Sequence, residues 1–453
     1  MMLVRRIVLL LALGMACLSG RIATAQPSAA LGEFDPNDSI PEELILPEDR
    51  PFITDSEFID MDSSLGCCDD GTCAECRRQV DPIFAWLEGV YVRGWIQQGV
   101  TFNSDSPANR FNTPVTFNDR SNEYTLNQLY MILEHPVDIH SEMANLGGRV
   151  DFLWGTDYFF TESFGLEKRL DGTQRWNSNN GPRGAGAAMY GLAMPQLYAE
   201  AFLPIAQGMT IKLGHFYTIV GYESVMAPEN FFYSHSYTMQ YGEPFTHTGA
   251  LATLQASRGL VLQAGFHRGW NAWEDNNDQL SFLGGFKLRS LDDRTTFAFT
   301  ITNGHEDANA DFSRTAISMV LRREIDACTS YVFQYDFGSE EGASVDGEAQ
   351  WFGLMHYLYY RMSPTTELGM RVEWFNDRDN ARVLGIADGS ASGEDYGAVT
   401  LGVNWQPCGN VLLRPELRWD VSNVRPPFGA GGMFDGFTSR NQFLAAIDMI
   451  WHF

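Results

Sequence analysis

Strict alternation of apolar and charged side chains over residues 410–421 is the feature that most restricts how this chain can fold. In an extended chain, one face of this segment carries only apolar side chains: Leu413, Pro415, Leu417, Trp419 and Val421. The other face carries only charged ones: Arg414, Glu416, Arg418 and Asp420. A soluble core cannot accommodate four charges on its inner face, whereas a water-filled lumen can. The pattern therefore predicts a strand of a membrane barrel with its apolar face toward lipid.

The same period of two recurs in four other segments, near 88–102, 143–154, 208–218 and 366–378. Together the five segments predict ten pore-lining charges: Arg93, Arg149, Asp151, Lys212, Arg371, Glu373, Arg414, Glu416, Arg418 and Asp420. The segments 122–135 and 348–362 are less regular because apolar residues fall on both faces. Pro415 cannot donate a ladder hydrogen bond, so we expect a bulge at this position.

Short polar connectors alternate with long ones from residue 81 onward. Seven short turns are expected near 135–138, 204–208, 256–259, 291–294, 324–327, 363–366 and 407–410. Eight long loops are expected near 104–121, 155–190, 219–243, 271–278, 305–312, 340–347, 379–396 and 422–440. Fifteen connections join 16 antiparallel up-and-down strands. Short turns at one rim and long loops at the other are typical of outer-membrane barrels.

Composition limits the classes of protein that remain. The chain has 453 residues, 44% of them hydrophobic and 13% aromatic, so a folded body is expected. Its 57 acidic residues outnumber 31 Lys and Arg, and the net charge of −26 excludes nucleic acid as a partner. After residue 25, no apolar run approaches the roughly 18–20 residues that a spanning helix needs. A membrane-spanning chain of this kind must therefore cross as strands.

The N-terminal part divides into two segments. Residues 1–25 combine basic residues, an apolar run and an Ala-Thr-Ala end, as in a secretory signal peptide. Residues 26–80 carry 14 acidic residues against three Arg and are interrupted by prolines, so we expect a flexible, acidic periplasmic leader. The barrel is then expected to occupy residues 81–453.

Four cysteines lie close together at the end of this leader: Cys67, Cys68, Cys73 and Cys76. In an oxidising compartment such a cluster favours disulfides, and a zinc site is the alternative. The spacing does not determine which cysteines pair. We expect no metal or other cofactor, and we find no motif of a conventional enzyme.

The last segment, residues 441–453, has apolar side chains at every second position and ends on Phe453. Bacterial outer-membrane barrels characteristically end in this way. The resemblance implies that the barrel-assembly machinery recognises the last strand through Phe453. It also implies that the protein resides in the outer membrane of a Gram-negative-type bacterium, in contact with outer-membrane lipid.

Residues 85–453 resemble a known family, the OmpL-like β-barrel porins (barrel porin family 2). The resemblance rests on residues 86–89 (WLEG) with 93–95 (RGW), on 221–223 (GYE) with 228–234 (PENFFYS), on 243–249 (EPFTHTG) and on 414–420 (RPELRWD). It implies passive diffusion of small hydrophilic solutes or ions across an outer membrane and supplies no catalytic residues. The leader with its four cysteines lies outside this pattern.

The loop 219–243 differs from the other long loops because it is rich in aromatic residues. Two interpretations remain open. The loop folds into the lumen and narrows the pore, or it forms a cap or a subunit contact. The first interpretation makes Glu223, Glu229 and Asn230 candidate constriction residues.

We therefore expect a 16-stranded outer-membrane barrel that acts as a passive diffusion channel and not as an enzyme. The alternative is a structural or attachment barrel of the cell envelope with a closed lumen. The acidic loops, with Glu223 and Glu229 at the constriction, predict a weak cation preference. The sequence leaves two assemblies open, a monomer and a homotrimer.

Overall fold

A computed structural model describes residues 89–453 except 179–180, 182–186, 307–310 and 430. The signal segment, the acidic leader and its four cysteines lie outside these described residues. The strands are β1 (Tyr91–Asn103), β2 (Glu123–His135), β3 (Asn145–Gly155), β4 (Gly191–Ala193), β5 (Leu197–Leu203), β6 (Met209–Tyr217), β7 (Thr246–Ser257), β8 (Leu260–His267), β9 (Ser281–Arg289), β10 (Thr295–His305), β11 (Ser313–Glu324), β12 (Thr329–Glu341), β13 (Glu348–Ser363), β14 (Thr366–Asp377), β15 (Asp395–Cys408), β16 (Val411–Ser422) and β17 (Asn441–His452). Short helical turns are α2 (Tyr158–Thr161), η5 (Ala227–Glu229) and η6 (Thr238–Gly242).

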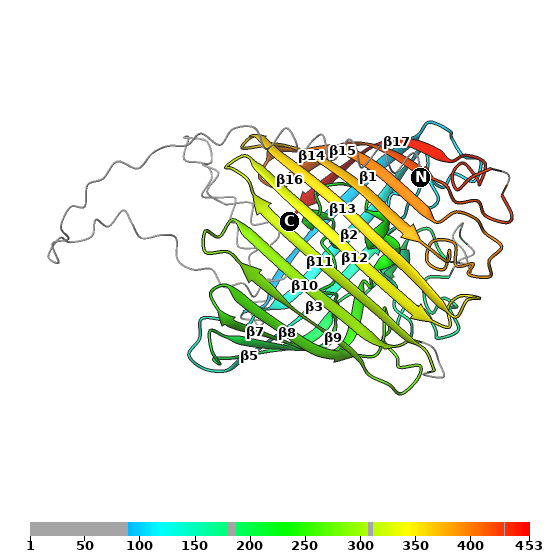
Figure 1. Cartoon of the computed structure of the whole chain (residues 1–453). Coiled ribbons are helices and arrows are strands. Elements are labelled where there is room, and N and C mark those ends of the chain that lie inside the picture. Colours follow the sequence, from blue (N-terminus) through cyan, green and yellow to red (C-terminus); the bar gives the residue numbers. More distant parts are fainter. Residues whose placement is uncertain (1–88, 179–180, 182–186, 307–310, 430) are drawn as a thin grey trace, which may run out of the picture. The chain divides into compact units, whose positions relative to one another are not determined.

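The strands form one closed antiparallel barrel (Figure 1). Strands β4 and β5 both pair with β3, so they are two pieces of one wall strand and the wall has 16 strands. β1 pairs with both β2 and β17, which closes the sheet and leaves no free edge among the described strands. The 16-stranded barrel expected from the sequence is confirmed.

The connections also follow the expected order. Among the described strands, successive wall strands are joined alternately by short turns, such as 258–259 and 409–410, and by long loops, such as 156–190 and 423–440. No helix of the described residues is long and apolar enough to cross a bilayer.

The two faces of the wall carry different side chains, as the alternation in the sequence predicts. On β16, Leu417 and Trp419 are 48% and 50% exposed on the outer face, while Arg418 between them is fully buried on the inner face. The inner face of β13 is apolar where Met355, Tyr357 and Tyr359 pack with Phe232, a residue of a loop inside the barrel. This packing explains why the segment 348–362 shows apolar residues on both faces.

The bulge expected at Pro415 is absent, and that prediction is wrong. Pro415 pairs with Ile447 in an uninterrupted register between β16 and β17. On the other side, the ladder to β15 has no pair for Arg414 or Pro415, and the register of the flanking pairs does not shift there. The missing N–H is therefore accommodated by a local gap in one ladder, without an inserted residue.

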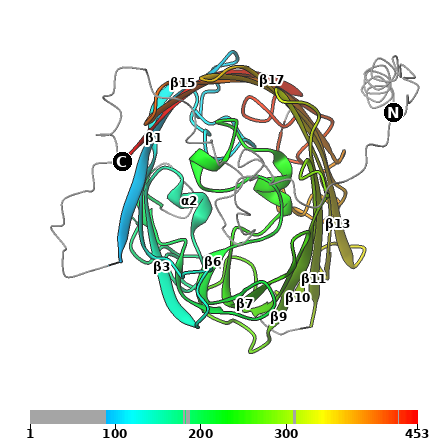
Figure 2. The same ribbon diagram turned by 90° about the vertical axis from the view of Figure 1, so that its left-hand side faces the viewer.

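The interior of the barrel is occupied by chain rather than left open. Figure 2 shows α2 and the two helical turns η5 and η6 inside the ring of strands. The turns η5 and η6 belong to the connection 218–245 between β6 and β7, which we call the lumen loop. The lumen loop enters the barrel, as the first interpretation of its aromatic composition predicts.

Candidate functional site

The lumen loop holds its own shape through a few local contacts. Pro228 is the second residue of the short 3-10 turn η5, where its fixed φ suits the first turn of a helix. The side chain of Asn230 accepts from Ser224 N at 2.9 Å and donates to Ser224 O at 2.7 Å and Met226 O at 3.0 Å. Asn230 is 6% exposed, so it fixes the fold of the loop from within.

Three arginines of the barrel wall donate to backbone carbonyls of the lumen loop. Arg414 on β16 donates to Ala227 O at 2.8 Å and Asn230 O at 2.7 Å. Arg371 on β14 donates to Ser234 O at 2.7 Å. The third donor is Arg418, which reaches His235 O at 2.5 Å. A loop in a barrel lacks ladder partners, and these guanidinium groups satisfy its carbonyl groups.

Two wall carboxylates accept from backbone N–H groups of the same loop. Glu416 on β16 accepts from Tyr233 N at 3.0 Å and Ser234 N at 3.2 Å. Glu373 on β14 accepts from Tyr237 N at 2.6 Å. Alternating basic and acidic side chains on the wall thus match the alternating C=O and N–H groups of the loop backbone.

Glu223 belongs to the loop and is itself held by the wall. Its carboxylate accepts from Arg371 Nη1 at 2.7 Å, from Tyr357 Oη at 3.0 Å and from Ser236 N at 2.8 Å. Burial opposes its ionisation, but the charge of Arg371 and the contact with His235 outweigh burial and hold the pKa of Glu223 well below its ordinary value. The charge of Glu223 is therefore compensated inside the protein.

The ten charges predicted to line the pore all lie on the inner face of the wall. Eight of them are at most 5% exposed: Arg149, Asp151, Arg371, Glu373, Arg414, Glu416, Arg418 and Asp420. These eight contact the lumen loop or pair with one another instead of facing open water. Arg93 is exposed and pairs with Glu134 at 2.7 Å, and Lys212 is half-buried over the ring of Tyr198. For all ten, a direct part in solute passage stays a prediction.

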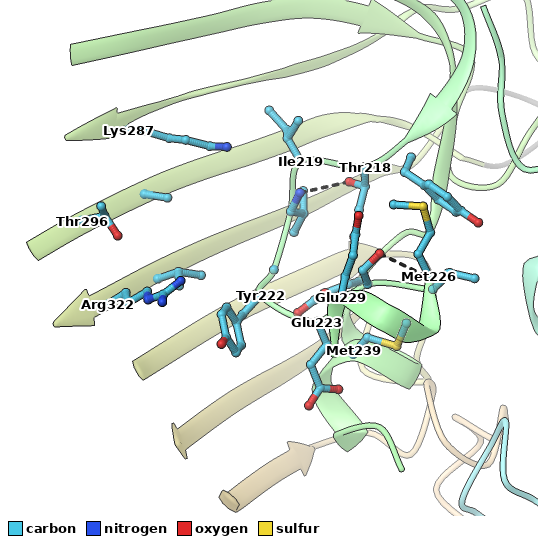
Figure 3. Close-up of a pocket in the computed structure, with 18 of the residues that line it drawn as sticks. Thr218, Ile219, Tyr222, Glu223, Met226, Glu229, Met239, Lys287, Thr296 and Arg322 are labelled. Atoms are coloured by element: carbon cyan, nitrogen blue, oxygen red, sulfur yellow. Dashed lines mark hydrogen bonds between the residues drawn. The ribbon is translucent and has the colours of Figure 1, made fainter. Parts of the chain in front are cut away.

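A cavity of about 380 Å³ lies between the lumen loop and the opposite wall. In Figure 3, Lys287, Thr296 and Arg322 extend into it from the strands, and Tyr222, Glu223 and Glu229 face it from the loop. The same wall supplies Arg289 and Ala298, from β9 and β10. The cavity therefore has a basic side made by β9–β11 and a loop side that carries carboxyl groups.

The two other loop carboxyl groups at this cavity do not behave as ordinary surface acids. Burial raises the pKa of Glu229 to about 7, against opposing contributions from Ser224 and from the charges of Arg149 and Arg93. Burial, followed by the nearby carboxyl of Asp336, raises the pKa of Glu243 well above its ordinary value. Glu243 also accepts from Gln334 at 2.6 Å.

The basic wall of the cavity was missed by sequence reasoning. Lys287 and Arg289 are two residues apart on β9, and Arg322 lies eight residues after Arg314 on β11, so each pair shares one face. The same period of two that revealed the other charged faces was present in these segments. What the pattern could not show is which charged face the lumen loop would leave uncovered.

Other candidate residues show no sign of a metal centre. The part of the chain that the structure describes has no group of three or more His, Cys, Asp and Glu side chains placed to hold a metal ion. Cys328 and Cys408, both near short turns, are exposed and free. The pairing of the leader cysteines cannot be compared, because those residues lie outside the described part.

A closed 16-stranded barrel with a lipid-facing apolar exterior and an internal loop defines an outer-membrane β-barrel of the porin class. A family model described as "Putative beta-barrel porin-2, OmpL-like" matches residues 89–453, and the chain belongs to this family. The protein is thus a porin of the outer membrane of Gram-negative bacteria that allows passive diffusion of small hydrophilic solutes.

Solved structures share the fold at low sequence identity. The outer membrane channel DcaP of Acinetobacter baumannii is 10% identical with a TM-score of 0.52, covering 80% of this chain and 97% of that one. An anion-selective porin from Comamonas acidovorans is 9% identical with a TM-score of 0.52, covering 80% of this chain and 99% of that one. No curated protein matches the chain.

Proposed function

We propose that solutes cross this porin through the cavity between the lumen loop and strands β9–β11. The observation that carries this proposal is the position of the loop. It is fastened by hydrogen bonds to β14 and β16, and the cavity lies on its other side. On this proposal the loop narrows the passage and the wall of β9–β11 forms the opposite side of the constriction.

Narrowing the cavity from its wall side tests this proposal. Ala298 lies on the inner face of β10 and lines the cavity. We expect Ala298→Trp to lower single-channel conductance in planar lipid bilayers, because the indole occupies the passage. Ala201→Trp on the outer face of β5 is the matched control and should leave conductance unchanged. Equal conductance of the wild type and Ala298→Trp would place the route elsewhere.

A closed barrel that serves envelope attachment is the second candidate. It is favoured by an aromatic cluster that joins the wall and the long loops, including Trp270, Trp351, Tyr237, Phe375 and Phe434. Such packing would oppose passage at the end of the barrel that carries the long loops. Bilayers that stay silent after insertion of correctly folded protein would favour this candidate over the channel.

We infer that the protein acts as a channel and not as a catalyst, and the porin family supports this inference.

We also propose that the protein forms a homotrimer and that the barrel-assembly machinery recognises Phe453. Phe453 pairs with Gly94 of β1 through two backbone hydrogen bonds of 3.0 Å, so this residue lies directly after β17 at the seam between β1 and β17. Light scattering in detergent tests the trimer, and assembly of a variant lacking Phe453 tests the recognition.

A further inference from the structure

The end of the helical turn η6 is held by side chains from two different elements. The last carbonyl groups of a helical turn have no donor within the turn and need donors from elsewhere. Gly242 O accepts from Trp351 Nε1 at 3.0 Å, and Tyr241 O accepts from Arg382 Nε at 2.8 Å. Trp351 lies on the wall strand β13, whereas Arg382 lies in the loop 378–394 between β14 and β15. One donor is therefore fixed in the wall, and the other is carried by a long loop.

Arg382 also connects η6 to the wall and to a second long loop. Its guanidinium carbon lies 4.7 Å from the ring centre of Trp351 and 5.4 Å from that of Trp270, within the distance of a cation–π contact. Its Nη1 atom lies 3.7 Å from Oε2 of Glu340 on β12. Trp270 belongs to the loop between β8 and β9. A single side chain thus contacts the lumen loop, the wall and a neighbouring long loop.

The position of Arg382 is set at the end of β14. The carboxylate of Asp377 accepts from the backbone N–H groups of Arg382 at 3.0 Å and Val383 at 2.8 Å. Val383 and Leu384 then pack against the aromatic cluster of the long-loop end. Residues 385–394 of the same loop are half-buried or exposed. The first residues of the loop are therefore the part that is inserted at the mouth of the barrel.

The aromatic cluster and the cavity lie at different levels of the barrel. Trp351 and Phe375 of the cluster lie at the long-loop ends of β13 and β14. The cavity reaches Asp293, in the short turn between β9 and β10. The turn η6 contributes to both, because Tyr241 packs against the cluster and Met239 lines the cavity. A solute that enters at the long-loop end meets the cluster before the cavity.

We propose that Arg382 is a latch: it keeps the long-loop end closed and holds η6 in place, and its release opens the passage. The proposal rests on the proposed route through the cavity. The contacts of Arg382 with Tyr241 and Glu340 are made by its side chain, so they can break while the strand ladders of the wall stay intact. Because η6 also lines the cavity, its release changes the narrow part of the passage as well as the mouth.

Planar-bilayer recordings of the full-length protein test the latch. Arg382→Gln loses the charge and the planar fork, so it cannot hold Tyr241 O, Glu340 and both rings together. We expect the ratio of open to closed time of single channels to rise about tenfold, as for the loss of one hydrogen bond to a charged group. Arg378→Gln in the same loop removes a guanidinium that donates to Gln350 at an exposed site, and it should leave this ratio unchanged.

Hydrogen exchange gives a second readout that does not depend on conduction. In Arg382→Gln, amides of residues 236–245 should exchange about tenfold faster than in the wild type, because their segment opens more often. Exchange in β1 and β17 should stay as in the wild type, and so should exchange of 236–245 in Arg378→Gln. Trp270→Leu removes one ring from beside Arg382 and should shift both readouts in the same direction. It is the second variant for the case that Arg382→Gln does not fold.

The two readouts separate the latch from the proposed route. Faster exchange of 236–245 in a folded protein that never conducts would overturn the route and support the hold of Arg382 on the lumen loop. A conducting Arg382→Gln channel with wild-type gating and wild-type exchange would overturn the latch and leave the route intact. More frequent opening without faster exchange would overturn the hold on the lumen loop and assign the gate to the loop 378–394 alone. Silence with unchanged exchange would overturn both proposals.

Discussion

Single side chains on the inner wall act as anchors for a folded loop. Arg418 is fully buried, donates to Asp420 at 2.8 Å, and lies 3.3 Å from Glu373. From alternation alone, a charge on the lumen face would be expected to tolerate loss, because water would replace its contacts. In the structure, Arg418 has no surface exposed to water. Removing its guanidinium group would leave the buried carboxylates of Glu373 and Asp420 without this counter-charge.

We therefore predict that Arg418→Leu destabilises the barrel by about 3–5 kcal/mol, the usual cost of breaking a buried ion pair. The midpoint of urea unfolding, followed by tryptophan fluorescence in lipid vesicles, measures this loss. Arg378→Leu at an exposed loop position is the control and should change stability by less than about 0.5 kcal/mol. For comparison, Leu417→Arg on the lipid face should cost about 2–4 kcal/mol. A wild-type midpoint for Arg418→Leu would show that the loop is not held by this pair.

At the scale of elements, inner-face glycines of the wall leave room for the aromatic side chains of the lumen loop. A Cβ on Gly369 of β14 would lie 2.2 Å from Cε1 of Phe231, and one on Gly402 of β15 would lie 3.1 Å from Phe232. A Cβ on Gly353 of β13 would similarly meet Thr238 at 2.2 Å. Because glycine has no side chain, the lumen loop packs directly against the strands at these three positions.

Gly369→Val should displace Phe231 and loosen the lumen loop, because overfilling a packed site costs about 1–3 kcal/mol. We expect faster cleavage within 218–245 by an added protease and a noisier open-channel current, with the barrel still folded on heat-modifiability gels. Gly409→Val at the β15–β16 turn, where a Cβ would meet nothing within 4 Å, is the control. Cleavage at the wild-type rate would mean that this contact does not hold the loop.

For the whole molecule, the lumen loop couples barrel stability to pH. Glu243, at the end of the loop, is buried beside Asp336 of β12, with Gln334 and Ser318 also in contact with that pair. Its raised pKa means that the folded protein keeps a proton that the unfolded chain releases above about pH 4.3. The contribution of Glu243 to stability therefore falls as pH rises, by up to about 1.4 kcal/mol per pH unit while only the folded protein holds this proton.

Glu243→Gln removes this titration and keeps an acceptor for Gln334 and a donor for Asp336. We predict that the variant loses less stability than the wild type between pH 5 and pH 9, measured as unfolding midpoints in urea. Glu274→Gln at an exposed loop position is the control, with the pH dependence of the wild type. If the unfolding midpoint depends on pH equally in Glu243→Gln and the wild type, groups other than Glu243 determine the pH dependence of stability.

The sequence alone determined the barrel, because strand faces depend on a local period of two. The alternating charges at Arg414–Asp420 and Arg149–Asp151 predicted which side chains lie on the inner face. The alternating connector lengths predicted 16 strands. The aromatic composition of 219–243 marked this loop as unusual but left open whether it enters the lumen or forms a cap, and the structure shows the first arrangement. Each of these inferences needs only neighbours along the chain.

Only the tertiary structure decided which charged side chains the loop covers. Arg371 and Glu223 are 148 residues apart, and Arg414 and Asn230 are 184 residues apart, so their contacts depend on how the barrel closes around the loop. The alternation pattern places an arginine on the inner face, but it does not show whether the guanidinium group contacts a carbonyl group, a carboxylate or a solute. The position of the loop against β14 and β16 left the basic wall of β9–β11 facing the cavity, and no local pattern carries that information.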